Sequence, residues 1–470
     1  MLFNSFVFIF LFLPIVLLSY FGLNKLKCYH AAKVVLVVAS LYFYAFFNWS
    51  YLPIILSSIA FNYFVGFHIT YSIKSKARKF YLILGLLFNV GLLGYFKYTD
   101  FFIENINVLF QSNFALKHIL LPLGISFFTF QQIAFVIDTY KKTRVLPKLL
   151  DYCNFVTFFP QLIAGPIVLP EEMLPQFEAK SNKSINYENL FNGLFLFSLG
   201  LAKKVFIADS VAVFANTGFD LMSTYTMAEA WLVSISYSIQ LYFDFSGYCD
   251  MAMGIGLMFN IKLPLNFNAP YRATNFQDFW RRWHMTLTRF LTQYLYIPLG
   301  GSRRGENRTL INIMIVFFVS GFWHGAGWTF IVWGILHGMS SVINRLWKHK
   351  GFPLPNILSI PFTFFFVNIF WVFFRADSLN KAWTIITSMF NNFNFVLTDN
   401  LRTNLASILP NRFNMLILFV GIILAFLGKT AYQQVQTTNH YYVKSVSTVL
   451  IFTISCLFIS RVVTFLYFNF

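Results

Sequence analysis

Long apolar runs alternate with short polar or basic segments along the whole chain. A run of about 17–25 apolar residues is long enough to cross a bilayer as a helix. The runs that predict spans lie near residues 4–23, 31–48, 51–72, 80–98, 119–138, 190–208, 227–246, 309–322, 328–344, 358–374, 413–428 and 445–466. Residues 155–170, with Pro160, Gly165 and Pro166, predict a re-entrant segment instead, because irregular backbone at membrane depth must be buried by protein or line a cavity. We therefore predict an all-α integral membrane protein with about 12 transmembrane helices, forming one domain over residues 1–470.

Basic residues concentrate in alternate loops. Lys25, Lys27 and Lys33 follow the first predicted span, and the loops after the third and fifth spans are also basic. Because Lys and Arg collect in cytoplasmic loops, this pattern predicts an N-terminus outside and, after an even number of spans, a C-terminus outside as well. Lys203 and Lys204 depart from the rule, since they fall near the outer end of a span.

The composition agrees with a membrane protein. Hydrophobic residues make up 57% of the chain and charged residues 11%, whereas soluble domains contain about 45–50% and about 25%, respectively. The formal charge of +18 lies mainly in alternate loops, which favours a role in topology over nucleic-acid binding. Cys28, Cys153, Cys249 and Cys456 lack metal-ligand spacing, so we predict no metal site.

Residues whose side chains could take part in a reaction or bind a substrate concentrate between Asp244 and His337. The chain contains no phosphate-binding loop, zinc-protease motif or nucleophile elbow. His324 lies in an apolar run that starts and ends beside basic loops, which places it at membrane depth, where ionisable groups are usually functional. Glycines on both sides let the backbone bend and leave room for a substrate. His284 borders an interface, where it either takes part in catalysis or anchors the chain.

A neutral histidine can accept a proton near neutral pH, and a low-dielectric site favours the neutral form. Because no serine or cysteine nucleophile accompanies these histidines, the pattern favours direct attack by a substrate hydroxyl, that is, group transfer between two bound molecules. A transporter with the histidines as a proton relay is the alternative. Many transporters contain internal repeats, and we find none in this sequence.

The chain resembles the membrane-bound O-acyltransferase family, in its bacterial branch of PatA-type and AlgI-type proteins that O-acetylate peptidoglycan or alginate. The motifs that carry the resemblance are FFPQLIAGP (158–166), DFSGY (244–248), RRWHMTL (281–287) and FWHG (322–325). The likeness extends from the first span to at least Arg375. It implies a multi-helix bundle with re-entrant helices around a central tunnel, in the bacterial inner membrane.

By this resemblance, His324 corresponds to the family's catalytic histidine and His284 to its second characteristic histidine. The donor would be a cytoplasmic thioester, acetyl-CoA or an acyl carrier protein, with no tightly bound cofactor. Basic residues that would bind this donor are Arg281, Arg282, Arg303 and Arg304, although the positive-inside rule alone also accounts for them. The implied partners are membrane lipids and a periplasmic, PatB-like O-acetyltransferase, without nucleic acid.

Beyond the family-like core of residues 1–428, the final predicted segment, 445–470, ends in F-x-Y-x-x-F (465–470). This ending resembles the C-terminal motif of the small DltX-type peptides that accept an acyl group in D-alanylation, and implies that Tyr467 carries the acetyl group outward. A phenolate is a better leaving group than an aliphatic alkoxide, because the phenol pKa is only about 10. The alternative is an interfacial aromatic anchor. Peptidoglycan is the expected acceptor; alginate or another exopolysaccharide, or D-alanyl transfer, are the alternatives.

Overall fold

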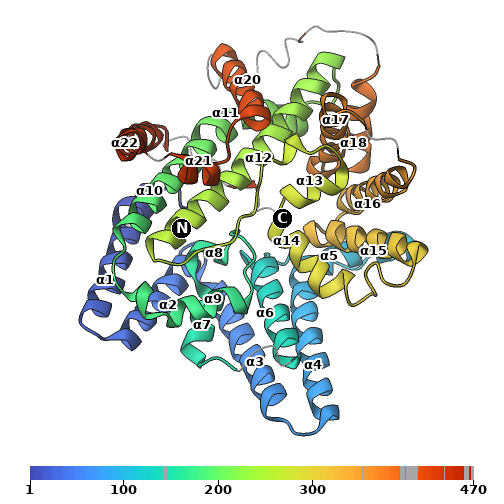
Figure 1. The fold of residues 1–470 in the computed structure, drawn as a ribbon. Helices are drawn as coiled ribbons and strands as arrows, with labels where there is room; N and C mark the ends of the chain where they lie inside the picture. The colour runs from blue at the N-terminus through green and yellow to red at the C-terminus, as the bar shows by residue number, and fades with distance from the viewer. Residues whose placement is uncertain are drawn as a thin grey trace. The chain divides into compact units, whose positions relative to one another are not determined.

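The computed structural model describes residues 1–141, 146–351, 354–391, 397, 411–438, 440–459 and 465–466. Within these ranges the chain forms helices and loops without strands (Figure 1). The predicted all-α class is therefore confirmed. The described helices pack into two compact units, residues 1–197 with 249–264 (unit 1) and residues 198–248 with 265–470 (unit 2). That the whole chain forms one domain stays a prediction.

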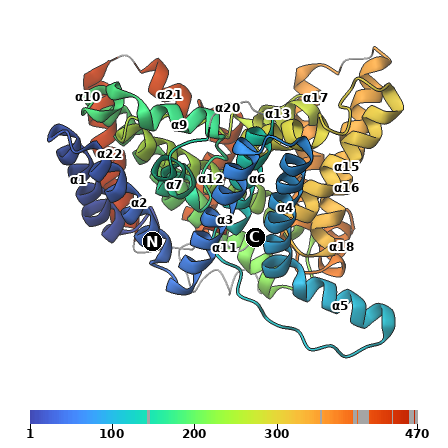
Figure 2. The same ribbon diagram turned by 90° about the horizontal axis from the view of Figure 1, so that it is seen from below.

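Unit 1 is an assembly of apolar helices. Its elements are α1 (Leu13–Lys25), α2 (Tyr29–Ala45), α3 (Leu52–Tyr71), α4 (Ser75–Leu93), α5 (Thr99–Phe110), α6 (Ile125–Tyr140), α7 (Leu149–Thr157), α8 (Phe159–Leu162) and α9 (Pro170–Glu178). Helices α3, α4 and α6 pack side by side (Figures 1 and 2). Gly85 allows this approach, because a Cβ there would lie 3.0 Å from both Val65 and Val136.

The segment that predicted a re-entrant element is a break in the helical structure of unit 1. Helix α7 ends at Thr157, the four-residue α8 follows, and residues 163–169 form no regular helix. All of residues 158–169 are buried. The irregular backbone is therefore covered by protein, which is the condition under which a membrane protein tolerates it.

Unit 2 carries most of the residues singled out in the sequence. Its elements are α11 (Asp209–Asn216), α13 (Phe276–Arg282), α14 (Met285–Leu291), α15 (Glu306–His324), α16 (Trp328–His349), α17 (Asn356–Arg375), α18 (Leu379–Ser388), α20 (Asn411–Leu427), α21 (Ala431–Thr437) and α22 (Tyr441–Phe458). Helices α10 (Tyr187–Ala202) and α12 (Met227–Met258) contribute residues to both units.

Helices α15 and α16 form a tightly packed hairpin in unit 2. The short turn between them lies where the sequence predicted a break between residues 322 and 328. Gly321 and Gly334 face each other, and a Cβ on Gly321 would lie 2.4 Å from the carbonyl oxygen of Phe330. The hairpin therefore fixes the position of the last turn of α15, which ends at His324.

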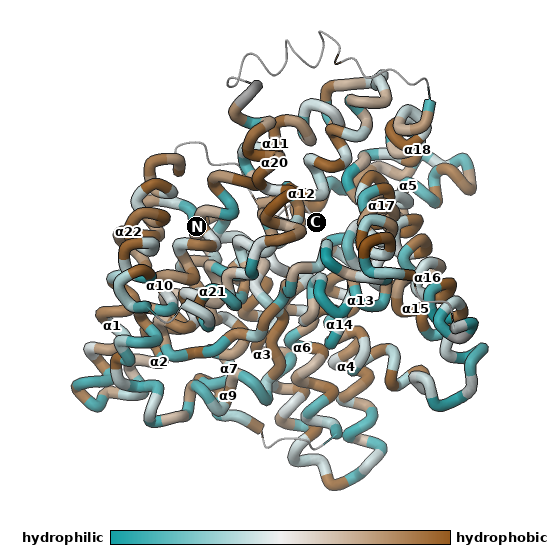
Figure 3. Tube along the Cα trace, turned by 45° about the horizontal axis from the view of Figure 1, so that its top comes forward, coloured by the Kyte–Doolittle hydropathy of each residue, from teal (hydrophilic) through white to brown (hydrophobic). Residues whose placement is uncertain are grey.

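Among the described residues, six helices are long and apolar enough to cross a membrane, or up to seven if one bent pair counts as a single span. The protein is thus a multi-pass membrane protein, and the apolar character of α17, α20 and α22 is visible in Figure 3. The predicted count of 12 spans is not confirmed. One reason is length: α6 has 16 residues, about 24 Å of helix, against a hydrocarbon core of about 30 Å. The orientation of the termini stays a prediction.

Candidate active site

The two histidines singled out in the sequence lie together in unit 2. His284 occupies the turn between α13 and α14, and His324 ends α15. Their ring centroids are 6.4 Å apart, and the two side chains are only 2% and 4% exposed. Forty residues of chain separate them, so the packing of α13, α14 and the α15–α16 hairpin creates the pair.

Asn266 orients the ring of His284. Its side-chain oxygen accepts hydrogen bonds from the backbone N–H of Thr286 at 3.2 Å and from the Thr286 hydroxyl at 2.9 Å. The same oxygen lies 3.1 Å from Nδ1 of His284. Because an amide oxygen only accepts, Nδ1 must carry the proton. The neutral ring therefore has its lone pair on Nε2, in the tautomer of a proton acceptor.

The environment keeps His284 neutral. Burial lowers the pKa of His284 from 6.5 to about 3, because the charged ring loses its hydration. The residue also adopts the left-handed backbone conformation, with a φ of 43°. For a non-glycine residue this conformation costs roughly 1 kcal/mol or more and occurs preferentially at functional sites. The contacts of Asn266 hold the strained turn in place, since its backbone carbonyl oxygen also accepts a hydrogen bond from the N–H of Met285 at 3.0 Å.

Aromatic side chains surround His324. The rings of Trp333 and Phe374 approach it edge-on, with centroids at 5.1 and 5.3 Å. The expectation that the following glycine leaves room for a substrate is wrong at Gly325, where a Cβ would lie 2.1 Å from the ring of Phe330. Glycine is required there because the ring of Phe330 fills that space.

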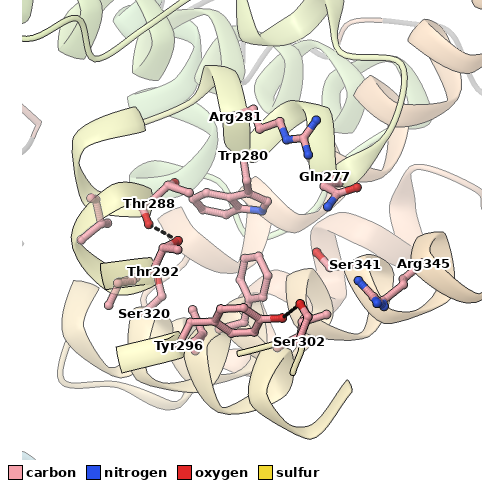
Figure 4. A pocket seen from close by; sticks show the side chains of 15 residues that line it. Gln277, Trp280, Arg281, Thr288, Thr292, Tyr296, Ser302, Ser320, Ser341 and Arg345 are labelled. Atoms are coloured by element: carbon pink, nitrogen blue, oxygen red, sulfur yellow. Dashed lines mark hydrogen bonds between the residues drawn. The ribbon is translucent and has the colours of Figure 1, made fainter. Parts of the chain in front are cut away.

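A cavity of about 390 Å³ lies between α13, α14, α15 and α16 in unit 2, and neither His284 nor His324 is among its lining residues. Figure 4 shows its lining from α13 to α16, with Gln277, Trp280, Arg281, Tyr296, Ser302 and Arg345 among the side chains. Ser320 also lines it, one helical turn before His324 on α15. The Ser320 hydroxyl is buried and has no hydrogen-bond partner among the described residues. Ser320 on the cavity wall is therefore about 6 Å from His324, measured along the axis of α15.

The four arginines predicted to bind the donor have different positions. Arg281 lines the cavity. Arg282 forms an ion pair with Asp278 at 2.9 Å. Arg303 and Arg304 are exposed in the turn before α15. Arg345, which no sequence motif marked as a donor-binding residue, lines the cavity and donates two hydrogen bonds to Glu306.

A third buried histidine was also missed as a site residue. Nε1 of Trp280 donates a hydrogen bond to Nδ1 of His337 at 3.2 Å. His337 is fully buried, and its Nε2 has no hydrogen-bond partner among the described residues. The contact holds Trp280 in the cavity wall. Tyr467 lies outside the described residues, and its role stays a prediction.

Comparisons with known proteins identify relatives over this part of the chain. The sequence profile of the membrane-bound O-acyltransferase family matches residues 139–379, which include both histidines. The chain is 47% identical to a peptidoglycan O-acetyltransferase of Helicobacter pylori, over 100% of this chain and 98% of the relative. It is 39% identical to a probable alginate O-acetylase AlgI of Pseudomonas aeruginosa, over 91% and 81%. A teichoic acid D-alanyltransferase of Bacillus subtilis is 27% identical over 52% of this chain and 66% of the relative.

Proposed function

Because the chain belongs to the membrane-bound O-acyltransferase family, we propose that it moves acetyl groups from a cytoplasmic thioester through a bacterial inner membrane for O-acetylation of peptidoglycan. Its being an acyltransferase removes the support for a proton-coupled transporter. The identity of 47% to a peptidoglycan O-acetyltransferase, over nearly all of both chains, supports this acceptor above alginate. The observation that carries the proposal is the buried pair of His284 and His324.

In the proposed reaction His324 is the general base. It accepts the proton of the attacking hydroxyl while the hydroxyl oxygen forms a bond to the acetyl carbonyl carbon. The carbon–sulfur bond breaks, and the departing thiolate takes up the proton. His284 is the second acid–base or positioning group. Asn266 fixes its tautomer before substrate binds, so no reorganisation is needed during the reaction.

The 390 Å³ cavity is the proposed site of the thioester-bearing arm of the donor, which is acetyl-CoA or an acyl carrier protein. Its size falls in the usual range of ligand pockets, about 300–1,000 Å³. Arg281 on its wall supplies positive charge for phosphate groups, and the exposed Arg303 and Arg304 add to it. Arg282 contributes less, because it is paired with Asp278.

The route outward is proposed to pass through Tyr467. The acetylated phenol keeps much of the transfer potential of the thioester and delivers the acetyl group to a periplasmic, PatB-like partner. Alginate or another exopolysaccharide remains the alternative acceptor, and D-alanine the alternative acyl group, in keeping with the D-alanyltransferase relative.

The proposal is tested in cells that express the chain in a strain lacking its own wall acetylation. Base-released acetate from purified peptidoglycan is measured for the parent, for His324→Ala, and for His30→Ala, which changes an exposed histidine of unit 1. We expect acetate with the parent and the control but a loss of about 100-fold or more with His324→Ala. Unchanged acetate with a normally expressed His324→Ala protein would overturn the assignment of His324 as the general base. Release of D-alanine instead of acetate would show that the group transferred is D-alanyl.

A further inference from the structure

A buried ionic cluster lies in unit 2 beside the segment that precedes Tyr467. Nζ of Lys204 is 2.5 Å from Asp244 and 2.8 Å from Asp209. The side chain of Lys204 is only 1% exposed and that of Asp244 only 2%. Lys204 departs from the positive-inside rule, and the structure gives the reason, since it is the centre of a buried ion cluster and not a loop cation. A buried charge is costly even when paired, which calls for a further role.

The cluster holds the described part of the C-terminal motif. One carboxylate oxygen of Asp244 binds Lys204, and the other accepts a hydrogen bond from the backbone N–H of Leu466 at 3.0 Å. The ring of Phe465 lies over Nζ of Lys204, 4.5 Å from its centroid. The same ring meets that of Tyr248 edge-on at 4.7 Å. Phe465 is therefore 1% exposed although it lies far along the chain from its partners.

These contacts give a role to a motif that the sequence analysis left without one. Asp244 and Tyr248 begin and end DFSGY. They are four residues apart on α12 and therefore lie on the same face of the helix. Asp244 contacts the backbone at position 466, while Lys204 and Tyr248 contact the aromatic ring at position 465. The first phenylalanine of F-x-Y-x-x-F is thus the residue whose ring Lys204 and Tyr248 contact.

We infer that Lys204, Asp244 and Tyr248 form a seat for Phe465 and Leu466 and thereby position Tyr467 for acyl transfer. The inference rests on the proposed tyrosine relay for its consequence, but not for the seat itself. These three are positioning residues, because they hold the backbone next to the reacting tyrosine without bonding to the acetyl group. The ammonium group of Lys204 holds the ring of Phe465, and the carboxylate of Asp244 holds the backbone N–H of Leu466.

The seat is tested by the chemical accessibility of position 466. Leu466→Cys is introduced into the full chain with its four native cysteines replaced by alanine, and its labelling by N-ethylmaleimide is timed in detergent. We expect labelling about tenfold or more faster when Asp244→Ala or Phe465→Ala is added. Phe465→Ala leaves the ion cluster intact, so it remains informative if Asp244→Ala does not fold.

A control is the partly buried pair of Lys33 and Asp151 in unit 1, which also joins a lysine to an aspartate. Lys33→Met with Asp151→Leu should leave the labelling rate at position 466 within about twofold. Equal labelling rates in the parent and in the folded Phe465→Ala and Asp244→Ala proteins would overturn the seat, whatever their acetylation activity.

A kinetic readout separates the seat from the relay. With a positioned relay, Phe465→Ala lowers kcat for acetyl transfer about tenfold or more, while KM for the thioester stays within about twofold. If labelling accelerates in Phe465→Ala but Tyr467→Phe still transfers acetyl groups normally, the seat stands and the relay fails. If labelling is unchanged but Tyr467→Phe is inactive, the relay stands and the seat fails.

Discussion

Two buried asparagine arrangements, one in each unit, show how the same side chain serves different ends. In unit 1 the amides of Asn62 and Asn89 bind each other, nitrogen to oxygen in both directions, at 3.1 and 2.6 Å. In unit 2 the oxygen of Asn266 faces Nδ1 of His284 and two donors of Thr286. In the first arrangement both amide nitrogens also donate to backbone carbonyls of their own helices, those of Ser58 and Gly85, and the pair joins α3 to α4. The second sets the tautomer of a buried base.

The comparison predicts that Asn266 matters for activity out of proportion to its size. Asn266→Ala removes the side-chain oxygen that fixes the His284 tautomer and accepts from Thr286, while the backbone carbonyl that accepts from Met285 remains. We expect kcat to fall about 100-fold, at the lower end of the contribution of a positioned acid–base group, with KM for the donor little changed. The measurement is acetyl transfer by purified protein from labelled acetyl-CoA. A variant with more than half of the parent activity would show that the contact is only structural.

Asn266→Asp sharpens the same point with a smaller expected loss, about tenfold. A carboxylate still accepts from Thr286 and His284 but stabilises the charged imidazole, so the pKa of His284 rises from its value of about 3. A raised pKa means that the ring stays protonated to a higher pH. The acidic limb of the kcat profile should therefore move to higher pH. A profile that keeps its shape and position would exclude His284 from the titration that limits activity.

Stability should also depend on pH through His284 but not through the amide pair. The folded pKa of about 3 lies below the unfolded value of 6.5, so the unfolded chain binds the proton first as pH falls. The contribution is fully present above about pH 6.5 and is lost progressively towards pH 3. The expected result is a falling Tm below pH 6.5 that is shallower in His284→Gln. Equal slopes for the two proteins in detergent would contradict it.

The sequence predicted the histidine pair but not its support, and the reason is the range of the contacts. His284 and His324 lie in short motifs that can be recognised locally, and the apolar runs predict the α15–α16 hairpin to within a few residues. Asn266 precedes His284 by 18 positions in a non-helical segment, and only tertiary packing brings the two together. Lys204 gave a signal as an exception to the charge rule, and Phe465 begins the F-x-Y-x-x-F motif, but no local pattern indicated that the two are in contact. The span count is not confirmed, because an apolar run does not give the helix length.

The smallest effect on activity is expected at the amide pair, and it tests the comparison from the other side. Asn62→Leu alone leaves Asn89 without its partner in a buried site, which should lower the free energy of unfolding by about 1–3 kcal/mol. The double variant, Asn62→Leu with Asn89→Leu, removes both polar groups and should recover most of that loss, because replacing both partners by apolar groups is nearly neutral. Acetyl transfer by the double variant should stay within about twofold of the parent, since the two amides bond to each other and to backbone carbonyls of their own helices. A loss of activity as large as that of Asn266→Ala, in a protein with the parental Tm, would mean that the interface between α3 and α4 takes part in the reaction. The distinction between a structural amide pair and an asparagine that orients a base would then no longer hold.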